Sequence, residues 1–218
     1  MASTRSHWEG VYATRAETDL SWYQPHSLRS LEMIASAAPD HGASIVDIGG
    51  GASRLVDDLT AKGYTDISVL DVSETALSKA KTRLGTRAPG VSWLVADITE
   101  WKPPRSYQVW HDRAVFHFLT DPGQQDAYLA ALRAGTHAGS AIIMATFALD
   151  GPEKCSGLPV QRYSPPLLAE RLGSTFKLVD QAAETHKTPG GAEQRFQYSV
   201  LRRTAAARAA SADPSALV

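Results

Sequence analysis

A glycine-rich turn beside a carboxylate is the part of this sequence best suited to bind a ligand. Asp47 and Ile48 end a short apolar run, and three glycines follow at positions 49–51. Glycine lets the chain turn sharply and lets a ligand approach the backbone closely. A helix beginning near Ser53 would point its free N–H groups at an anionic group. Taken alone, the pattern also fits a tight turn between a strand and a helix.

A second carboxylate narrows the choice of ligand. Asp71 stands twenty positions after Gly51, at the predicted end of the second strand. A carboxylate there can accept hydrogen bonds from ribose hydroxyls, although it can also cap the next helix. A dinucleotide site would need a third glycine where Arg54 stands, and Asp47 would repel a phosphate. The turn therefore favours a nucleoside ligand without a pyrophosphate.

The glycine turn resembles that of a known family, the class I methyltransferases that use S-adenosyl-L-methionine (SAM). The family carries an acidic-x-G-x-G turn, which is matched here by Asp47-Ile48-Gly49-Gly50-Gly51. The resemblance implies that the turn carries the methionine part of SAM, that Asp71 binds ribose and that Val72 and Ile98 contact adenine. Ser53 departs from the third glycine of many members. The implied cofactor contacts in this part of the chain are Asp47, Gly49, Gly50, Gly51, Ser53, Asp71, Val72, Asp97, Ile98, His111 and Phe116.

The N-terminal segment is aromatic. Trp8, Tyr12, Trp22 and Tyr23 resemble the lid segment of small-molecule methyltransferases of the thiopurine and tellurite groups. Such a lid would exclude water, and its rings would attract the sulfonium of SAM. We therefore expect Trp8, Tyr12 and Trp22 at the cofactor and Tyr23 at the acceptor. Packing of the two tryptophans on the sheet is the alternative, and the two roles are compatible.

The candidate catalytic residues follow the fourth predicted strand. Methyl transfer needs in-line placement of the acceptor, and a base where the acceptor carries a proton. If a helix follows the strand, Arg113 and His117 share one of its faces. Our hypothesis is that Asp112 and Arg113 shape the acceptor pocket and that His117 is a base or a polar contact. The plainer alternative for His117 is a buried histidine.

The loop at residues 150–163 is a predicted wall of the acceptor pocket. Arg162 would hold an anionic group, and Cys155 would meet a soft atom. A solvated arginine and an inert small cysteine are the alternatives. His111, His117 and Cys155 lack the compact spacing of metal ligands, so we expect no metal.

Alternating apolar runs and helix-like stretches predict the scaffold for these residues. Helices between successive strands imply a mainly parallel, doubly wound sheet, in which ligands bind beyond the carboxyl ends of the strands. The turn signal at 188–191 predicts an antiparallel hairpin at the C-terminal end. We expect a Rossmann-like α/β fold with seven strands, at 44–48, 67–70, 91–95, 107–111, 141–147, 176–179 and 195–201.

Composition and breaker residues set the expected organisation. We expect a helical lid segment at 1–40, a SAM-binding domain at 41–203 and a mobile tail at 204–218. The formal charge of −1 argues against a nucleic-acid partner. No apolar run approaches the roughly 20 residues that cross a bilayer, so no membrane partner is expected. A single cysteine fits a cytoplasmic location.

These patterns predict an enzyme that moves a methyl group from SAM to a small-molecule nucleophile, such as sulfur, selenium or another soft atom. Two alternatives stay open. A protein-lysine methyltransferase would use Asp112 as its acidic residue, and a non-catalytic SAM-binding regulator would keep the cofactor site alone. The oligomeric state is not predicted.

Overall fold

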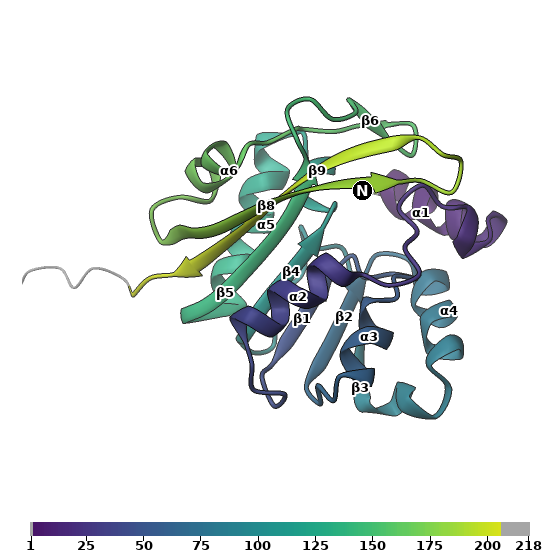
Figure 1. Ribbon diagram of the computed structural model, residues 1–218, viewed down its shortest axis with the longest axis horizontal. Helices are drawn as coiled ribbons and strands as arrows, with labels where there is room; N and C mark the ends of the chain where they lie inside the picture. The colour runs from purple at the N-terminus through teal and green to yellow at the C-terminus, as the bar shows by residue number, and fades with distance from the viewer. Residues whose placement is uncertain (1, 206–218) are drawn as a thin grey trace, which may run out of the picture.

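A seven-stranded sheet forms the central layer of the protein in the computed structural model, which describes residues 2–205 (Figure 1). The strand order is β3-β2-β1-β4-β5-β9-β8. Its strands are β1 (Ile45–Ile48), β2 (Ile67–Asp71), β3 (Val91–Val95), β4 (Tyr107–Arg113), β5 (Thr136–Phe147), β8 (Phe176–Lys187) and β9 (Glu193–Arg203). A separate two-stranded sheet is formed by β6 (Lys154–Cys155) and β7 (Leu158–Pro159).

The first five strands of the chain run parallel, and the last two make an antiparallel hairpin. β1 pairs in parallel with both β2 and β4, so the strand order reverses beside β1. β9 pairs antiparallel with both β5 and β8. The predicted Rossmann-like sheet with a closing antiparallel pair is confirmed. In such a sheet, the reversal creates a crevice at the carboxyl ends of β1 and β4.

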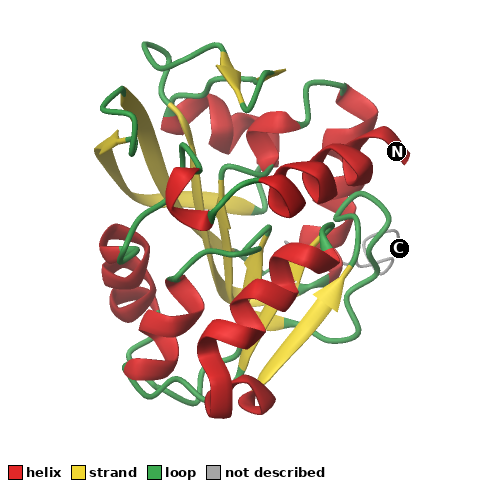
Figure 2. Cartoon of the chain, turned by 90° about the vertical axis from the view of Figure 1, so that its right-hand side faces the viewer, coloured by secondary structure: helices red, strands yellow, loops and turns green. Residues whose placement is uncertain are grey.

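Helices cover both faces of the sheet, as Figure 2 shows. One apolar core joins the sheet to α2, α3 and α4, and a second core joins the other face to α5 and α6. Central strands are therefore buried on both sides, which explains their nearly continuous apolar sequence. The helices are α1 (Ala2–Thr14), α2 (Leu28–Ala37), α3 (Leu55–Ala61), α4 (Glu74–Leu84), α5 (Pro122–Ala134) and α6 (Pro165–Leu172), with short 3-10 turns η1 (Glu17–Asp19), η2 (Gly85–Gly90) and η3 (Phe116–Phe118).

Three helices begin at a side chain that caps their first turn. Ser73 Oγ accepts a hydrogen bond from the backbone N–H of Ala76 at 3.1 Å, at the start of α4. Asp121 caps α5 and Ser164 caps α6 in the same way, each followed by a proline. A side-chain oxygen at this position satisfies a helix N–H that has no partner within the helix.

Two strands are longer than predicted, because their additional residues lack an apolar pattern. β5 begins at Thr136 rather than 141, because residues 136–140 carry no apolar run. β8 continues to Lys187 rather than 179, since much of this edge strand is exposed and needs no apolar pattern. The α-helix after β4, on which the pairing of Arg113 and His117 depended, does not form. Ala114 has φ 71°, a left-handed conformation that ends the strand and leads into the short turn η3.

The N-terminal elements lie at the carboxyl ends of the parallel strands. α1 packs beside α4, and Figure 1 places it near the far tip of the β8–β9 hairpin. The predicted tail at 204–218 lies outside the described residues from 206 onward. Within residues 2–205, no helix is long and apolar enough to cross a membrane.

Candidate active site

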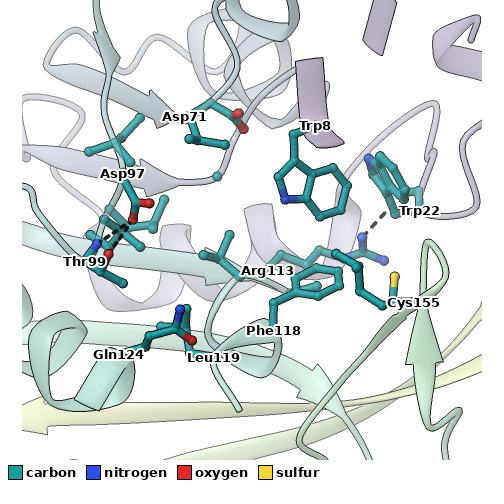
Figure 3. Close-up of a pocket in the computed structure, with 18 of the residues that line it drawn as sticks. Trp8, Trp22, Asp71, Asp97, Thr99, Arg113, Phe118, Leu119, Gln124 and Cys155 are labelled. Atoms are coloured by element: carbon teal, nitrogen blue, oxygen red, sulfur yellow. Dashed lines mark hydrogen bonds between the residues drawn. The ribbon is translucent and has the colours of Figure 1, made fainter. Parts of the chain in front are cut away.

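A cavity of about 310 Å³ opens at the carboxyl ends of β1, β2, β3 and β4. One end, which we name the acidic end, is built from Gly49, Asp71, Val72, Asp97, Ile98 and Thr99. The other, the aromatic end, is lined by Trp8, Trp22, Arg113, Phe118, Cys155, Leu158, Pro159, Gln194 and Phe196. In Figure 3, Asp97 and Thr99 lie on the left, Trp22 and Cys155 lie on the right, and Trp8, Arg113 and Phe118 lie between them.

The glycine turn forms part of the cavity floor and has no room for side chains. Gly49 and Gly51 have φ values of 65° and 45°, where other residues are strained. A Cβ at position 49 would lie 2.0 Å from Cγ2 of Val115. A Cβ at position 51 would lie 2.8 Å from both the Tyr12 hydroxyl and Asp71 Oδ2. The turn is thus closed over by Tyr12 from α1.

Two carboxylates are held in fixed positions at the acidic end. Asp71 is buried at the end of β2, and its Oδ1 accepts a hydrogen bond from the Ser73 N–H at 2.8 Å. Burial, with a smaller contribution from nearby Asp47, raises the pKa of Asp71 to about 7. Asp97 accepts bonds from the backbone and hydroxyl of Thr99 at 2.9 and 2.7 Å (Figure 3). Both side chains are positioned to accept hydrogen bonds from a ligand.

A buried polar chain links the glycine turn to the aromatic end. Asp47 Oδ1 lies 2.7 Å from Nδ1 of His111, and His111 Nε2 lies 2.9 Å from the hydroxyl of Ser30. Ser30 contacts the Tyr198 hydroxyl at 3.3 Å, and the same hydroxyl accepts a bond from Arg113 Nε at 3.2 Å. Asp47 and His111 therefore bind each other and Ser30, and neither lines the main cavity.

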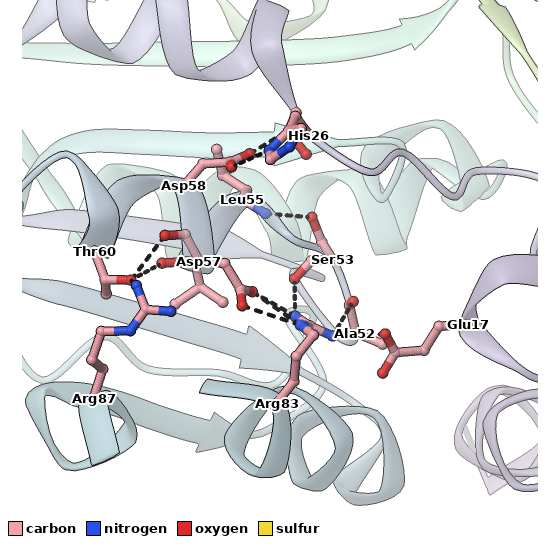
Figure 4. A network of polar contacts seen from close by, with 12 residues as sticks. Glu17, His26, Ala52, Ser53, Leu55, Asp57, Asp58, Thr60, Arg83 and Arg87 are labelled. Atoms are coloured by element: carbon pink, nitrogen blue, oxygen red, sulfur yellow. Dashed lines mark hydrogen bonds and ion pairs between the residues drawn. The ribbon is translucent and has the colours of Figure 1, made fainter. Parts of the chain in front are cut away.

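Arg83 fixes the outer side of the glycine turn (Figure 4). Its guanidinium donates to the carbonyls of Ala52 and Ser53 at 3.0 and 2.7 Å. It also forms ion pairs with Asp57 of α3 and Glu17 of η1, both at 2.8 Å. One side chain of α4 thus joins the turn, the following helix and the N-terminal segment. Sequence reasoning missed Arg83, because no motif marks a residue 32 positions beyond the turn.

Three rings from separate segments build the aromatic end. Trp8 contacts Trp22 and Phe118 edge to face, with centroid distances of 5.7 and 5.2 Å. Tyr12 lies 6.1 Å from Trp22 in the same type of contact. The N-terminal aromatics therefore both pack together and line the cavity.

Arg113, the last residue of β4, faces this aromatic end. Its guanidinium lies 4.5 Å above the ring of Phe196. Nη1 donates to the Trp22 carbonyl at 3.4 Å, the bond drawn in Figure 3. Nη2 lies 4.0 Å from Oε2 of Glu184, which is beyond hydrogen-bonding distance. Oε2 of Glu184 is likewise buried without a hydrogen bond, so the two side chains form a buried ion pair with no hydrogen bond between these atoms.

The two other predicted catalytic residues do not line the cavity. Asp112 is fully buried and accepts bonds from the N–H groups of Val115 and Phe116 and from the Tyr128 hydroxyl. Burial raises its pKa to about 6. These contacts give Asp112 a structural task, which is to fix the turn after β4.

His117 is also fully buried, and it does not share a helix face with Arg113 because η3 replaces the expected helix. Its ring packs against Phe118 and Phe147 at 4.5 and 4.9 Å, and neither ring nitrogen has a hydrogen-bond partner. Burial, with a contribution from Arg113, lowers its pKa to about 3. A neutral histidine outside the cavity is poorly placed to be a base.

Of the two acceptor contacts predicted in the loop at residues 150–163, one lines the cavity and the other does not. Cys155 lies on the cavity wall, where burial raises the pKa of its thiol to about 11. Arg162 instead donates to the carbonyl of Gly151 and pairs with Glu153, away from the cavity. Phe116 is buried against Tyr128 and Tyr163 and contributes only to packing near the cavity.

The remaining predicted residues surround a smaller neighbouring hollow. Arg54 lies in it with a buried Nε that has no hydrogen-bond partner, and its guanidinium is 5.8 Å from the ring centre of Tyr23. The hollow shares Trp22, Ile48, Gly49 and Arg113 with the main cavity. Its lining also includes Asp47, Gly50, Ser53, Tyr23 and His111. Sequence reasoning used Arg54 only as an argument against a dinucleotide.

Among residues 2–205, no three His, Cys, Asp or Glu side chains gather as a metal site would require.

The chain is similar to known methyltransferases. Residues 45–139 match the model of a methyltransferase domain. A malonyl-[acyl-carrier protein] O-methyltransferase from Anoxybacillus flavithermus is 31% identical over 156 residues, which are 69% of this chain and 58% of that protein. A mouse eEF1A lysine and N-terminal methyltransferase is 32% identical over 123 residues, or 56% of this chain and 16% of that protein. This chain thus spans less than two thirds of either relative.

Solved structures agree on the fold. The 1,6-didemethyltoxoflavin-N1-methyltransferase of Burkholderia thailandensis, with its acceptor and S-adenosylhomocysteine (SAH) bound, superposes with a TM-score of 0.70. That alignment covers 94% of this chain and 88% of the other at 18% identity. Residues 45–139 thus match a methyltransferase domain, in agreement with the resemblance of the glycine turn, and the whole fold is shared with this solved SAH-bound methyltransferase.

Proposed function

We propose that this protein transfers a methyl group from SAM to a small-molecule acceptor. The observation that carries the proposal is one cavity with two carboxylates, Asp71 and Asp97, at one end and an aromatic wall that includes Trp8 of α1 at the other. SAM supplies an electrophilic methyl group. The protein has to hold the donor, exclude water and place the acceptor atom in line.

The acidic end fits the nucleoside part of SAM. Asp71 would accept bonds from the ribose hydroxyls, and Asp97 would accept from the adenine amine beside Ile98 and Val72. The bare glycine turn leaves space for the methionine part. Arg54, with its unpartnered Nε, would face the methionine carboxylate in the smaller hollow, since a buried donor without a partner favours an anionic ligand.

The aromatic end fits a small acceptor better than a lysine side chain. Among the described residues that line it, none is acidic, so an ammonium group would find no carboxylate partner on this wall. Neither Asp112 nor His117 lines this end. Because no base stands there, the acceptor atom has to be nucleophilic without one, as thiolates and soft anions are. Similarity to the lysine-modifying mouse protein keeps lysine as a second candidate.

Calorimetry with SAM, SAH and NAD tests the cofactor. We expect SAM and SAH to bind and NAD to give no heat, and we expect Asp71→Ala to weaken SAH binding by roughly tenfold or more, as loss of hydrogen bonds to a charged group predicts. Asp180→Ala, at an exposed position of β8, is the matched control. Binding of NAD with no response to SAH would overturn the proposal.

A labelled-methyl screen tests the acceptor class. Incubation of the protein with labelled SAM and thiols, metalloid anions or a protein extract should place the label in small products. Label found only in proteins of the extract would favour the lysine enzyme. SAH binding without transfer to any acceptor would favour the regulator.

A further inference from the structure

The aromatic end offers rings to an acceptor but no group that could take a proton from it. Among the described residues that line this end, Arg113 is the charged one, and Glu184 balances its charge in the buried ion pair at 4.0 Å. An arginine side chain stays protonated in proteins, so it cannot serve as a base. Methylation at this end is therefore easiest for an atom that has a free lone pair and no proton to lose.

The thiol of Cys155 shows how this wall affects an ionisable sulfur. Burial raises its pKa to about 11, and the nearby charge of Arg113 offsets only part of this effect. A substrate thiol bound on the same wall would lose solvation in the same way and would stay protonated near neutral pH. The thiolate is the reactive form of a thiol, and this wall offers no base that would produce it. A neutral lone pair fits the wall better.

Three rings from separate segments of the chain line this end of the cavity, namely Trp8 of α1, Trp22 after η1 and Phe118 of η3 (Figure 3). The planes of Trp22 and Phe118 stand at 79° and 73° to that of Trp8, with centroid distances of 5.7 and 5.2 Å. The three rings therefore form an angled wall rather than a parallel stack. Aromatic faces attract cations, most strongly where water is excluded. Such a wall favours a positively charged ligand over an anion.

We propose that the methyl acceptor is an apolar molecule with a neutral nitrogen that carries no hydrogen, such as the ring nitrogen of a quinoline, and that the product is its N-methyl cation. The inference rests on the proposed methyltransferase function. The nitrogen lone pair forms the new N–C bond, the bond between sulfur and the methyl carbon breaks, and its electron pair returns to sulfur. SAM loses its positive charge as the product gains one, so no proton moves.

Calorimetry on the full-length protein saturated with SAH tests recognition of the cation. N-methylquinolinium and 4-methylquinoline have nearly the same size and shape, and at pH 8 only the first is charged. We expect N-methylquinolinium to bind at least about tenfold more tightly, because several rings can attract its charge. Equal binding of the two probes, or tighter binding of 4-methylquinoline, would overturn the inference.

Variants assign the preference to the rings. Phe118→Leu and Trp22→Leu each remove one aromatic face and keep an apolar side chain, so each should lower the preference for the cation at least about threefold. Trp93→Leu is the matched control, because Trp93 lies on β3 with its ring N–H bonded to the carbonyl of Ala88. It should keep the full preference. A preference that stays intact in both Phe118→Leu and Trp22→Leu would refute the role of the rings.

SAH binding shows that Phe118→Leu is folded, since this residue lines the aromatic end rather than the acidic end. Labelled SAM with quinoline and with phenylmethanethiol then separates the acceptor from the function. We expect the label in N-methylquinolinium. Methylation of the thiol but not of quinoline would overturn the acceptor inference and leave the methyltransferase function standing. Failure of the wild-type protein to bind SAH would overturn the proposed function itself.

Discussion

His117 illustrates how one buried side chain couples stability to pH. Burial lowers its pKa to about 3 in the folded protein, while an unfolded chain has a value near 6.5. The unfolded state therefore binds the proton first as the solution becomes acidic. The stability contributed by neutral His117 is present above about pH 6.5 and is lost as the pH falls toward 3.

We expect His117→Phe to remove this acid sensitivity. Between pH 6.5 and 4, the free energy of unfolding of the wild type should fall more steeply than that of the variant, by up to about 1.4 kcal/mol per pH unit. Urea unfolding at several pH values measures the difference. His137→Phe, at an exposed position, is the control.

The same variant bears on catalysis. Turnover at saturating SAM and acceptor should persist in His117→Phe, because the ring does not reach the cavity. A fall in kcat of a hundredfold or more, the usual size of general-base catalysis, would restore the base role and contradict the geometry.

At the scale of elements, Arg83 joins α4 to the glycine turn through two carbonyls and two carboxylates. Arg83→Lys keeps the charge but cannot reproduce the planar fork. We expect the Kd of SAH to rise on the order of tenfold, as loss of one or two charged hydrogen bonds predicts. Calorimetry measures it, with Arg87→Lys in the following 3-10 turn as the matched control. An unchanged Kd in Arg83→Lys would show that the turn holds its shape without this contact.

The sheet and most of its helices could be predicted from the sequence. Periodicity and capping residues such as Ser73 and Asp121 predict the sheet and its helices, because burial and capping are local demands on residue type. The acidic end was predictable for the same reason, since Asp71 and Asp97 end their strands.

The aromatic end was predictable only in part. Gln194 and Phe196 reach it from a hairpin 80 residues beyond β4, and no local pattern reports such a contact. The left-handed conformation of Ala114 could not be predicted either, because alanine rarely adopts it. It turns the chain into η3, so His117 is buried while Arg113 faces the cavity.

At the scale of the molecule, α1 covers part of the cavity and is tied to the domain. Lys79 of α4 donates to the carbonyls of Tyr12 and Arg15 at 2.6 and 3.0 Å. Glu9 accepts a bond from the backbone N–H of Glu74 at 2.6 Å. A bound ligand beneath α1 would add contacts that hold this segment in place.

We therefore expect SAH to protect the chain after α1. Trypsin cleavage at the exposed Arg15 should slow severalfold when SAH is saturating, because cleavage requires local opening of the segment. Mass spectrometry follows the fragments. Cleavage after Lys62, at the far end of α3, serves as the internal control. Equal slowing at both sites would point to global stabilisation rather than closure.

Trp8 and Tyr12 stand one helical turn apart on α1. Trp8 faces the aromatic end, whereas Tyr12 lies over the glycine turn. One helix thus contributes to both parts of the site. Under the proposed function, the methylated product and SAH would leave past the same helix. Release of both molecules would then limit the rate of steady-state turnover. A burst of product in the first turnover, followed by a slower steady state, would be the kinetic evidence for it.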